Sequence, residues 1–144
     1  MERTTYLLLF VFSLILVSGI ACEETGPTVP PTPVVVIDAN LRTMLDLVES
    51  NEVAAKAEYK GKWVEFTGII SEGAIEEDKF DLIPTNSDMF QMSGAECKLT
   101  KEEQSKVIGL RAGQTVTVKG QVKDISTFLT TEFKIDKCQI LSGN

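Results

Sequence analysis

The spacing of apolar residues along the chain changes, and it predicts helices first and strands afterwards. Between Asn40 and Val48 apolar residues recur at intervals of three and four, as on one face of a helix that Asp38 or Asn40 could cap. Asn51 can cap a second, shorter helix. From Lys62 onward the period changes to two, which is typical of a half-buried strand. We therefore expect two N-terminal helices packed on a β-rich domain.

Two of the alternating segments share the pattern Val-x-(Phe/Val)-x-Gly. They begin at Val64 and Val116 and place Gly68 and Gly120 at matching positions in mid-strand. A glycine weakens a strand unless the sheet bends sharply there or another backbone comes close. Closing a small barrel requires both features, so the two glycines favour a barrel over a flat sheet.

The remaining segments complete the order strand, strand, strand, helix, strand, strand. A capping box of Thr100 and Glu103 predicts the start of the helix, and Gly113 predicts its end. This order predicts a mainly β fold with α-helices: a five-stranded OB-fold β-barrel with a helix between its third and fourth strands. The expected strands cover residues 63–70, 74–83, 89–99 with a break at Ser93-Gly94, 115–122 and 129–141.

Residues 1–21 have the pattern of a signal peptide. The apolar run from Tyr6 to Ile20 is shorter than the ~20 residues of a membrane-spanning helix, and its end before Cys22 carries the small residues Ser18, Gly19 and Ala21. The segment from Ser18 to Cys22 resembles the lipobox of bacterial lipoproteins, whose cysteine is diacylated, although an ordinary secreted protein with a spare thiol is the alternative. We expect lipid attachment at Cys22 and a location in the cell envelope, at the outer membrane or periplasmic side if the organism has two membranes.

A tether separates this anchor from the folded domain. Four of the five prolines lie between residues 23 and 36, together with threonine and glycine, so this part of the chain is expected to stay extended. We assign residues 22–37 to the tether and residues 38–144 to a single OB-fold domain.

The composition argues against an enzyme and against a metal or cofactor site. The chain has no histidine, and neither a Gly-x-Ser-x-Gly nor a Ser-x-x-Lys motif nor a phosphate-binding glycine loop occurs in it. One dense acidic run has a spacing unlike that of an EF-hand loop, so a solvated turn between the first two strands is favoured over a cation site. This run comprises Glu72, Glu76, Glu77, Asp78 and Asp81.

The net charge of -7 also makes nucleic acid an unfavourable partner. OB-folds that bind single strands use a basic groove and stacking aromatics, whereas lysines here are interspersed with an excess of acids. We predict a membrane-anchored, non-catalytic binding or adaptor module, with an envelope protein or oligosaccharide as partner; single-stranded nucleic-acid binding is the alternative. The candidate ligand-binding face, with loops at 71–73 and 123–127, comprises Phe80, Leu82, Phe90, Lys123 and Phe128.

Residues 39–141 also resemble a known family, the tRNA-anti-like OB-fold proteins of the bacterial envelope. The similar segments are residues 51–55, 59–62, 64–68, 110–120 and 136–140, together with Cys97. The resemblance implies an OB-fold in a lipoprotein or secreted protein, and the family name by itself does not imply RNA binding. An aromatic residue that the family often has two positions after the first cysteine is Leu99 here, so a stacking role at this position is not carried over.

Cys97 and Cys138 remain once Cys22 is assigned to lipid. In an oxidising compartment two thiols that can meet form a disulfide by default, and two buried reduced thiols are the alternative. The resemblance supports the disulfide, because the third and fifth strands of an OB barrel are neighbours. Such a bond would close a loop of about 42 residues.

Overall fold

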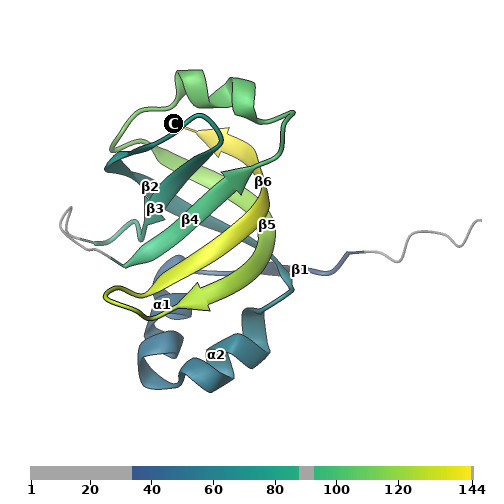
Figure 1. Ribbon diagram of the computed structural model, residues 1–144, viewed down its shortest axis with the longest axis vertical. Coiled ribbons are helices and arrows are strands. Elements are labelled where there is room, and N and C mark those ends of the chain that lie inside the picture. The colour runs from purple at the N-terminus through teal and green to yellow at the C-terminus, as the bar shows by residue number, and fades with distance from the viewer. Residues whose placement is uncertain (1–33, 88–92, 144) are drawn as a thin grey trace, which may run out of the picture. The chain divides into compact units, whose positions relative to one another are not determined.

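The computed structural model describes residues 34–87 and 93–143; the predicted signal peptide, Cys22 and Phe90 lie outside this part of the chain. Six strands are hydrogen-bonded in the order β1-β2-β3-β4-β6-β5, and a further pairing of β2 with β5 closes the last five into a barrel, with β1 outside (Figure 1). The predicted five-stranded barrel is therefore confirmed. The elements are β1 Val36–Asp38, α1 Leu41–Ser50, α2 Glu52–Tyr59, β2 Trp63–Ile75, β3 Lys79–Ile83, β4 Gly94–Leu99, the 3-10 helix η1 Gln104–Gly109, β5 Thr115–Ser126 and β6 Glu132–Gly143.

Both predicted N-terminal helices are present, and asparagine side chains cap them. The Asn40 Oδ1 accepts hydrogen bonds from the backbone N–H groups of Arg42 and Thr43, at 3.0 and 3.2 Å. The Asn51 Oδ1 accepts one from Ala54 at 3.0 Å. The two helices cover one end of the barrel (Figure 1), and α1 buries Leu41, Met44, Leu45 and Val48 in the core.

The two mid-strand glycines lie where β2 and β5 pair to close the barrel. In this antiparallel pair Val64 is opposite Gly120, and Gly68 is opposite Val116. A Cβ atom at Gly68 would lie 3.0 Å from the Ile83 carbonyl oxygen, and one at Gly120 would overlap the Ile135 side chain. The predicted close approach at both glycines is therefore confirmed.

Two predicted loops are in fact parts of strands. Residues 71–73 belong to β2, which pairs with β5 along its first half and with β3 along its second. Gly73 has φ +70° at the irregular part of the β2–β3 register, so the strand continues past a sequence that is typical of a turn. Residues 123–126 likewise extend β5, so the actual connections cover residues 76–78 and 127–131.

Two further predictions need correction. Val36 and Ile37, assigned to the tether, form β1 with Asp38, because a parallel pairing with residues 63–65 satisfies their backbone groups. The helix after β4 is the 3-10 helix η1, and the Glu103 side chain does not cap it. Instead the Glu103 carboxylate accepts a hydrogen bond from the Ile140 N–H at 2.9 Å and ties η1 to β6.

Candidate functional site

The structure does not bring the predicted ligand-face residues together on one surface. Phe80 and Leu82 are fully buried inside the barrel, because the alternation along β3 turns them inward and Lys79 and Asp81 outward. Lys123 is exposed on β5 and forms an ion pair with Asp136 at 3.2 Å. Phe128 is exposed in the loop between β5 and β6. Of the described candidates, only Lys123 and Phe128 are therefore available to a ligand.

The outer face of β3 and β4, which OB-folds commonly use for ligands, is acidic at one end. Cross-strand pairing places Asp81 opposite Glu96, and carboxylate oxygens of these two residues and of Glu132 lie within 4.8 Å of one another. Burial, together with the charges of Glu132 and Glu96, raises the pKa of Asp81 to about 6. Lys79 supplies the nearest counter-charge, with its Nζ 2.9 Å from Glu96. A phosphate backbone would be repelled at this position.

The predicted acidic run does not stay together in the structure. Only Asp81 of the run joins the cluster with Glu96 and Glu132, while residues 76–78 form the short connection between β2 and β3. The pairing of β3 with β4 and of β4 with β6 brings these distant carboxylates together. Spacing along the sequence could not reveal them, since the register between strands decides which residues meet.

The loop between β5 and β6 presents two large apolar side chains to solvent. Phe128 is 82% exposed and Leu129 is 90% exposed. Leu129 has φ +69°, in the left-handed region that residues other than glycine seldom adopt. Strained backbone of this kind is concentrated at sites that bind ligands or partners. In OB-folds this connection is one of the two loops that flank the ligand site.

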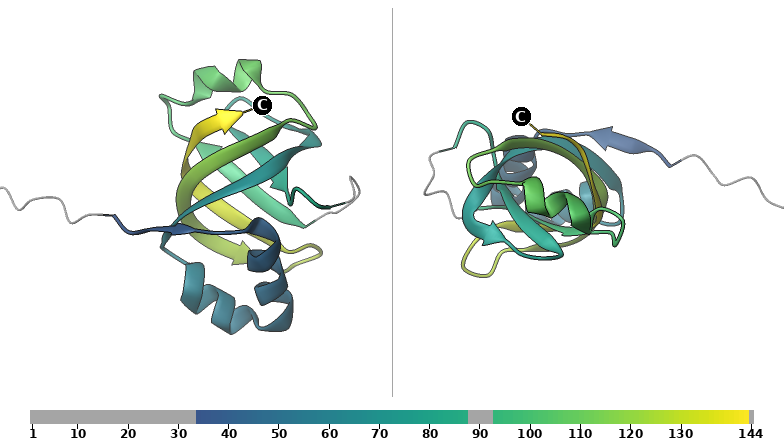
Figure 2. Two further views of the ribbon diagram at one scale, coloured as in Figure 1. Left: turned by 180° about the vertical axis from the view of Figure 1, so that it is seen from behind. Right: turned by 90° about the horizontal axis from the view of Figure 1, so that it is seen from above.

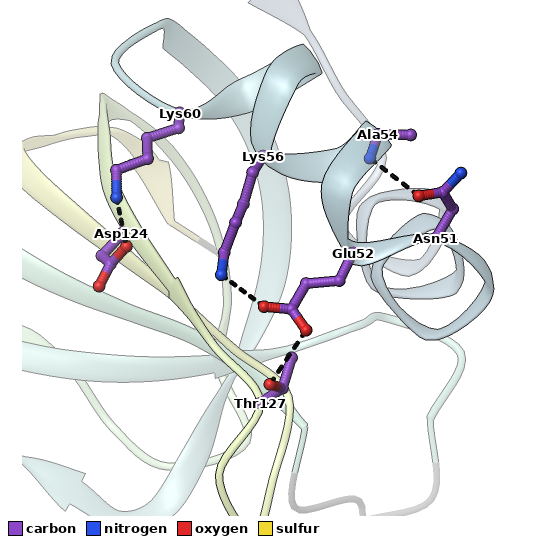
Figure 3. Close-up of polar contacts among 7 residues, drawn as sticks. All are labelled: Asn51, Glu52, Ala54, Lys56, Lys60, Asp124 and Thr127. Atoms are coloured by element: carbon purple, nitrogen blue, oxygen red, sulfur yellow. Dashed lines mark hydrogen bonds and ion pairs between the residues drawn. The ribbon is translucent and has the colours of Figure 1, made fainter.

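Helix α2 holds the base of this loop through side-chain contacts (Figure 3). The Glu52 carboxylate accepts hydrogen bonds from the Lys56 Nζ and, at 3.3 Å, from the Thr127 hydroxyl. The Lys60 Nζ lies 2.8 Å from the Asp124 carboxylate in β5. These contacts orient the loop, so its exposed side chains project from a supported base.

A second surface is built around Trp63 at the start of β2. The Lys119 Nζ lies 5.9 Å from the centre of the Trp63 ring, and the Lys137 Nζ lies 6.0 Å from it. Both distances are within the range of cation–π attraction. Alternation alone predicts that Trp63 and Lys119 face outward, but the sequence does not show that their strands are neighbours.

An open groove of about 580 Å³ lies between the β2–β3 connection and η1. Ile75, Val107 and Leu110 provide apolar lining, and Glu76 and Glu77 add acidic groups. Ile108 lies at this groove and is almost fully exposed. The groove lies at η1, whereas the loop with Phe128 joins β5 to β6, so these two exposed apolar features belong to different parts of the fold.

Cys97 and Cys138 lie on neighbouring strands, β4 and β6, as the family resemblance implied. Both are buried free thiols in the structure. Burial, with a smaller contribution from the neighbouring Cys138 thiol, raises the pKa of Cys97 well above its ordinary value. A disulfide between them stays a prediction.

Comparison with known proteins identifies the family. The sequence model of the tRNA_anti-like family matches residues 1–132. The chain belongs to this family. The tRNA_anti-like proteins are OB-fold binding modules, and a search of the curated proteins found no match. Within the described part of the chain, no helix is both long and apolar enough to cross a membrane.

One solved structure has a similar fold. A "putative nucleic acid-binding lipoprotein" from Klebsiella pneumoniae subsp. pneumoniae MGH 78578 aligns with a TM-score of 0.54 and 16% identity, over 76% of this chain and 92% of that chain. A chain of the Stn1-Ten1 complex from S. pombe aligns with a TM-score of 0.34 and 20% identity, over 55% of this chain and 57% of that chain. The first likeness concerns the fold alone, and the second is too distant to inform it.

Proposed function

We propose that this tRNA_anti-like protein is a non-catalytic binding module of the bacterial cell envelope, held on the membrane by lipid attached to Cys22. The signal pattern of residues 1–21 and the cysteine that follows support the anchor. The Klebsiella structure of similar fold is itself named a lipoprotein. Two or three acyl chains bury enough methylene groups to keep a protein on a bilayer.

The observation that carries the binding role is the pair of exposed apolar side chains, Phe128 and Leu129, in a loop that α2 supports. Aromatic side chains that fill a pocket at the centre of an interface often contribute much of the binding energy in protein complexes. The contact between Glu52 and Thr127 orients the base of the loop before a partner binds, which reduces the entropy lost on association. We therefore propose an envelope protein with an apolar pocket as the partner.

Nucleic acid is the weaker alternative because the carboxylates of Asp81, Glu96 and Glu132 lie on the strand face that OB-folds commonly offer to bases. Fluorescence anisotropy with labelled single-stranded oligonucleotides checks this alternative. At about 50 mM salt we expect no binding, whereas binding that weakens steeply with added salt would favour the nucleic-acid function.

Site-specific photocrosslinking in intact cells tests the proposed contact. A photoreactive phenylalanine analogue at position 128 is expected to yield a protein adduct of one discrete mass. Ile108 is a matched control, because it is also apolar and almost fully exposed but lies in η1. Leu129→Ser should reduce the adduct from position 128. No adduct from position 128, or the same adducts from positions 128 and 108, would contradict the proposal.

A further inference from the structure

One outer surface of the barrel combines apolar and cationic side chains where β1, β2, β5 and β6 lie side by side. In the strand register Val36 is opposite Trp63, and Lys119 is opposite Gln139. Val34, Trp63, Lys119 and Gln139 line a shallow hollow of about 100 Å³. We call this surface the Trp63 face; it comprises Val34, Val36, Trp63, Lys119 and Lys137.

The two lysines of the Trp63 face are not held in ion pairs within the described part of the chain. Among residues 34–87 and 93–143, neither Lys119 nor Lys137 takes part in an ion pair. The Lys137 Nζ donates a hydrogen bond to the side-chain oxygen of Gln121 at 3.3 Å. Glu65 is opposite Lys119 in the register but forms no ion pair with it in this part of the chain. In contrast, acidic partners lie within 4 Å of Lys56, Lys60, Lys79, Lys98, Lys106 and Lys123.

Two carboxylates lie on the same outer surface, because Glu65 is opposite Lys119 and Asp38 is opposite Glu65 in the strand register. Electrostatic interactions at a surface are screened over a Debye length of about 8 Å at physiological ionic strength. An anionic surface that touches Trp63 therefore interacts with Lys119 and Lys137 and with these two neighbouring carboxylates, while more distant acidic groups are screened.

Tryptophan beside lysine is a combination that suits the interface of a lipid bilayer. The indole ring is amphipathic and concentrates at the level of the lipid headgroups. Lysine side chains extend their ammonium groups to anionic headgroups while their methylene stems pack on apolar surface. Val34, which is more than half exposed, adds apolar area beside the ring.

The chain reaches the Trp63 face directly from the predicted anchor. Val34 follows Cys22 by twelve residues, which span at most about 40 Å when fully extended. A lipid on Cys22 would thus keep this face close to a bilayer at a high effective concentration. Under that condition even weak contacts between the face and the membrane become populated.

We infer that the Trp63 face docks on a bilayer that contains anionic phospholipid, an inference that rests on the proposed lipid anchor. The start of β1 and the loop between β5 and β6 lie on opposite sides of the barrel in all three views (Figures 1 and 2). Docking through the Trp63 face therefore turns Phe128 and Leu129 away from the bilayer. The barrel then presents its apolar loop to a partner that approaches from the aqueous side.

A vesicle-binding experiment tests this inference with the anchor removed. Every residue of the buried core lies between Ile37 and Ile140, so a protein that starts at residue 34 retains the complete core. Trp63 is the chain's one tryptophan, and its fluorescence reports on the docking surface itself. We expect this protein to sediment with phosphatidylglycerol vesicles, with a blue shift of emission, and not with phosphatidylcholine vesicles.

Substitution of the two lysines provides the decisive comparison. Each lysine near an anionic surface contributes about fivefold to partitioning, so Lys119→Gln with Lys137→Gln should lower vesicle binding by about twenty-five-fold. Lys101→Gln with Arg111→Gln removes the same charge from exposed positions outside the Trp63 face and should leave binding unchanged.

Three results would overturn the inference. The first is no blue shift with phosphatidylglycerol vesicles, and the second is equal binding by the two double variants. The third is an emission shift with oligonucleotides but not with vesicles. None of these results depends on Cys22, which this protein lacks. Failure of the anchor would instead appear as full-length protein and its Cys22→Ser variant in the same soluble fraction.

Discussion

At Gly120 the barrel leaves no room for a side chain. A Cβ atom there would overlap Ile135 and would lie 3.1 Å from both the Asp136 carbonyl oxygen and the Cys138 sulfur. All three obstacles are backbone or buried atoms, so the structure cannot relax cheaply. We expect Gly120→Ala to lower the free energy of unfolding by about 1–3 kcal/mol, measured by denaturant titration.

Gly109→Ala is the matched control for this prediction. A Cβ atom at Gly109 would have no neighbour within 4 Å, and the backbone there is not in the left-handed region. The control should retain or slightly raise stability, since alanine restricts the unfolded chain. Equal stability of the two variants would contradict the claim that the strands leave no room for a side chain at Gly120.

Asp81 makes folding depend on pH in the mildly acidic range. Burial, with the nearby carboxylates, raises its pKa to about 6 in the folded protein, compared with about 3.9 in an unfolded chain. Between these values the folded state binds more protons than the unfolded state. Stability therefore decreases as the pH rises from about 4 to 6.

Asp81→Asn should remove this pH dependence and stabilise the protein at pH 7. The full shift corresponds to nearly 3 kcal/mol, and partial solvent exposure reduces the expected gain to about 1 kcal/mol. Thermal unfolding at pH 4.5 and pH 7 measures the effect. Asp38→Asn, at an exposed position on β1, is the control. A loss of stability in Asp81→Asn at pH 7 would contradict the assigned environment.

At the residue scale, the sequence indicated the closely packed glycines but placed the ligand face partly inside the core. Gly68 and Gly120 were recognisable because glycine in mid-strand is unfavourable without a structural reason. Phe80 and Leu82 carry no such signal, since an aromatic or aliphatic residue in an alternating strand fits either side. The exposed pair Phe128 and Leu129 became clear only when the connection between β5 and β6 was located.

At the scale of elements, the two N-terminal helices were predicted more accurately than the strand ends. The side chains of Asn40 and Asn51 accept hydrogen bonds from the first backbone N–H groups of α1 and α2, and such caps are visible in sequence. Strand ends depend on partners far along the chain: β2 runs to Ile75 because it serves both β5 and β3. Strand β1 has only three residues, too few to be recognised by alternation, and it is extended because it pairs with β2.

The neighbouring strands β4 and β6 support a prediction about the two buried cysteines. We expect Cys97 and Cys138 of the mature protein to form a disulfide, which would raise the free energy of unfolding by about 4 kcal/mol on the chain-entropy account. Peptide mapping under non-reducing conditions should find one linked pair. Two thiols that alkylate after denaturation without reductant would contradict the bond.

At the scale of the whole molecule, the two proposed surfaces of the domain have different roles. The Trp63 face lies where the chain arrives from Cys22, and the supported loop with Phe128 lies on the opposite side (Figure 2). The predicted tether would allow the barrel to turn, and docking would select one orientation. This arrangement suits a module that links a membrane to a partner and carries out no chemistry of its own.

Lipid on Cys22 is proposed to hold the domain on a membrane, and this is tested by the intact mass of the protein extracted from cell membranes. We expect a mature chain that starts at Cys22 and carries the added mass of a diacylglyceryl group, with or without a third acyl chain. Recovery of a chain that starts elsewhere, or of one with an unmodified Cys22, would contradict it.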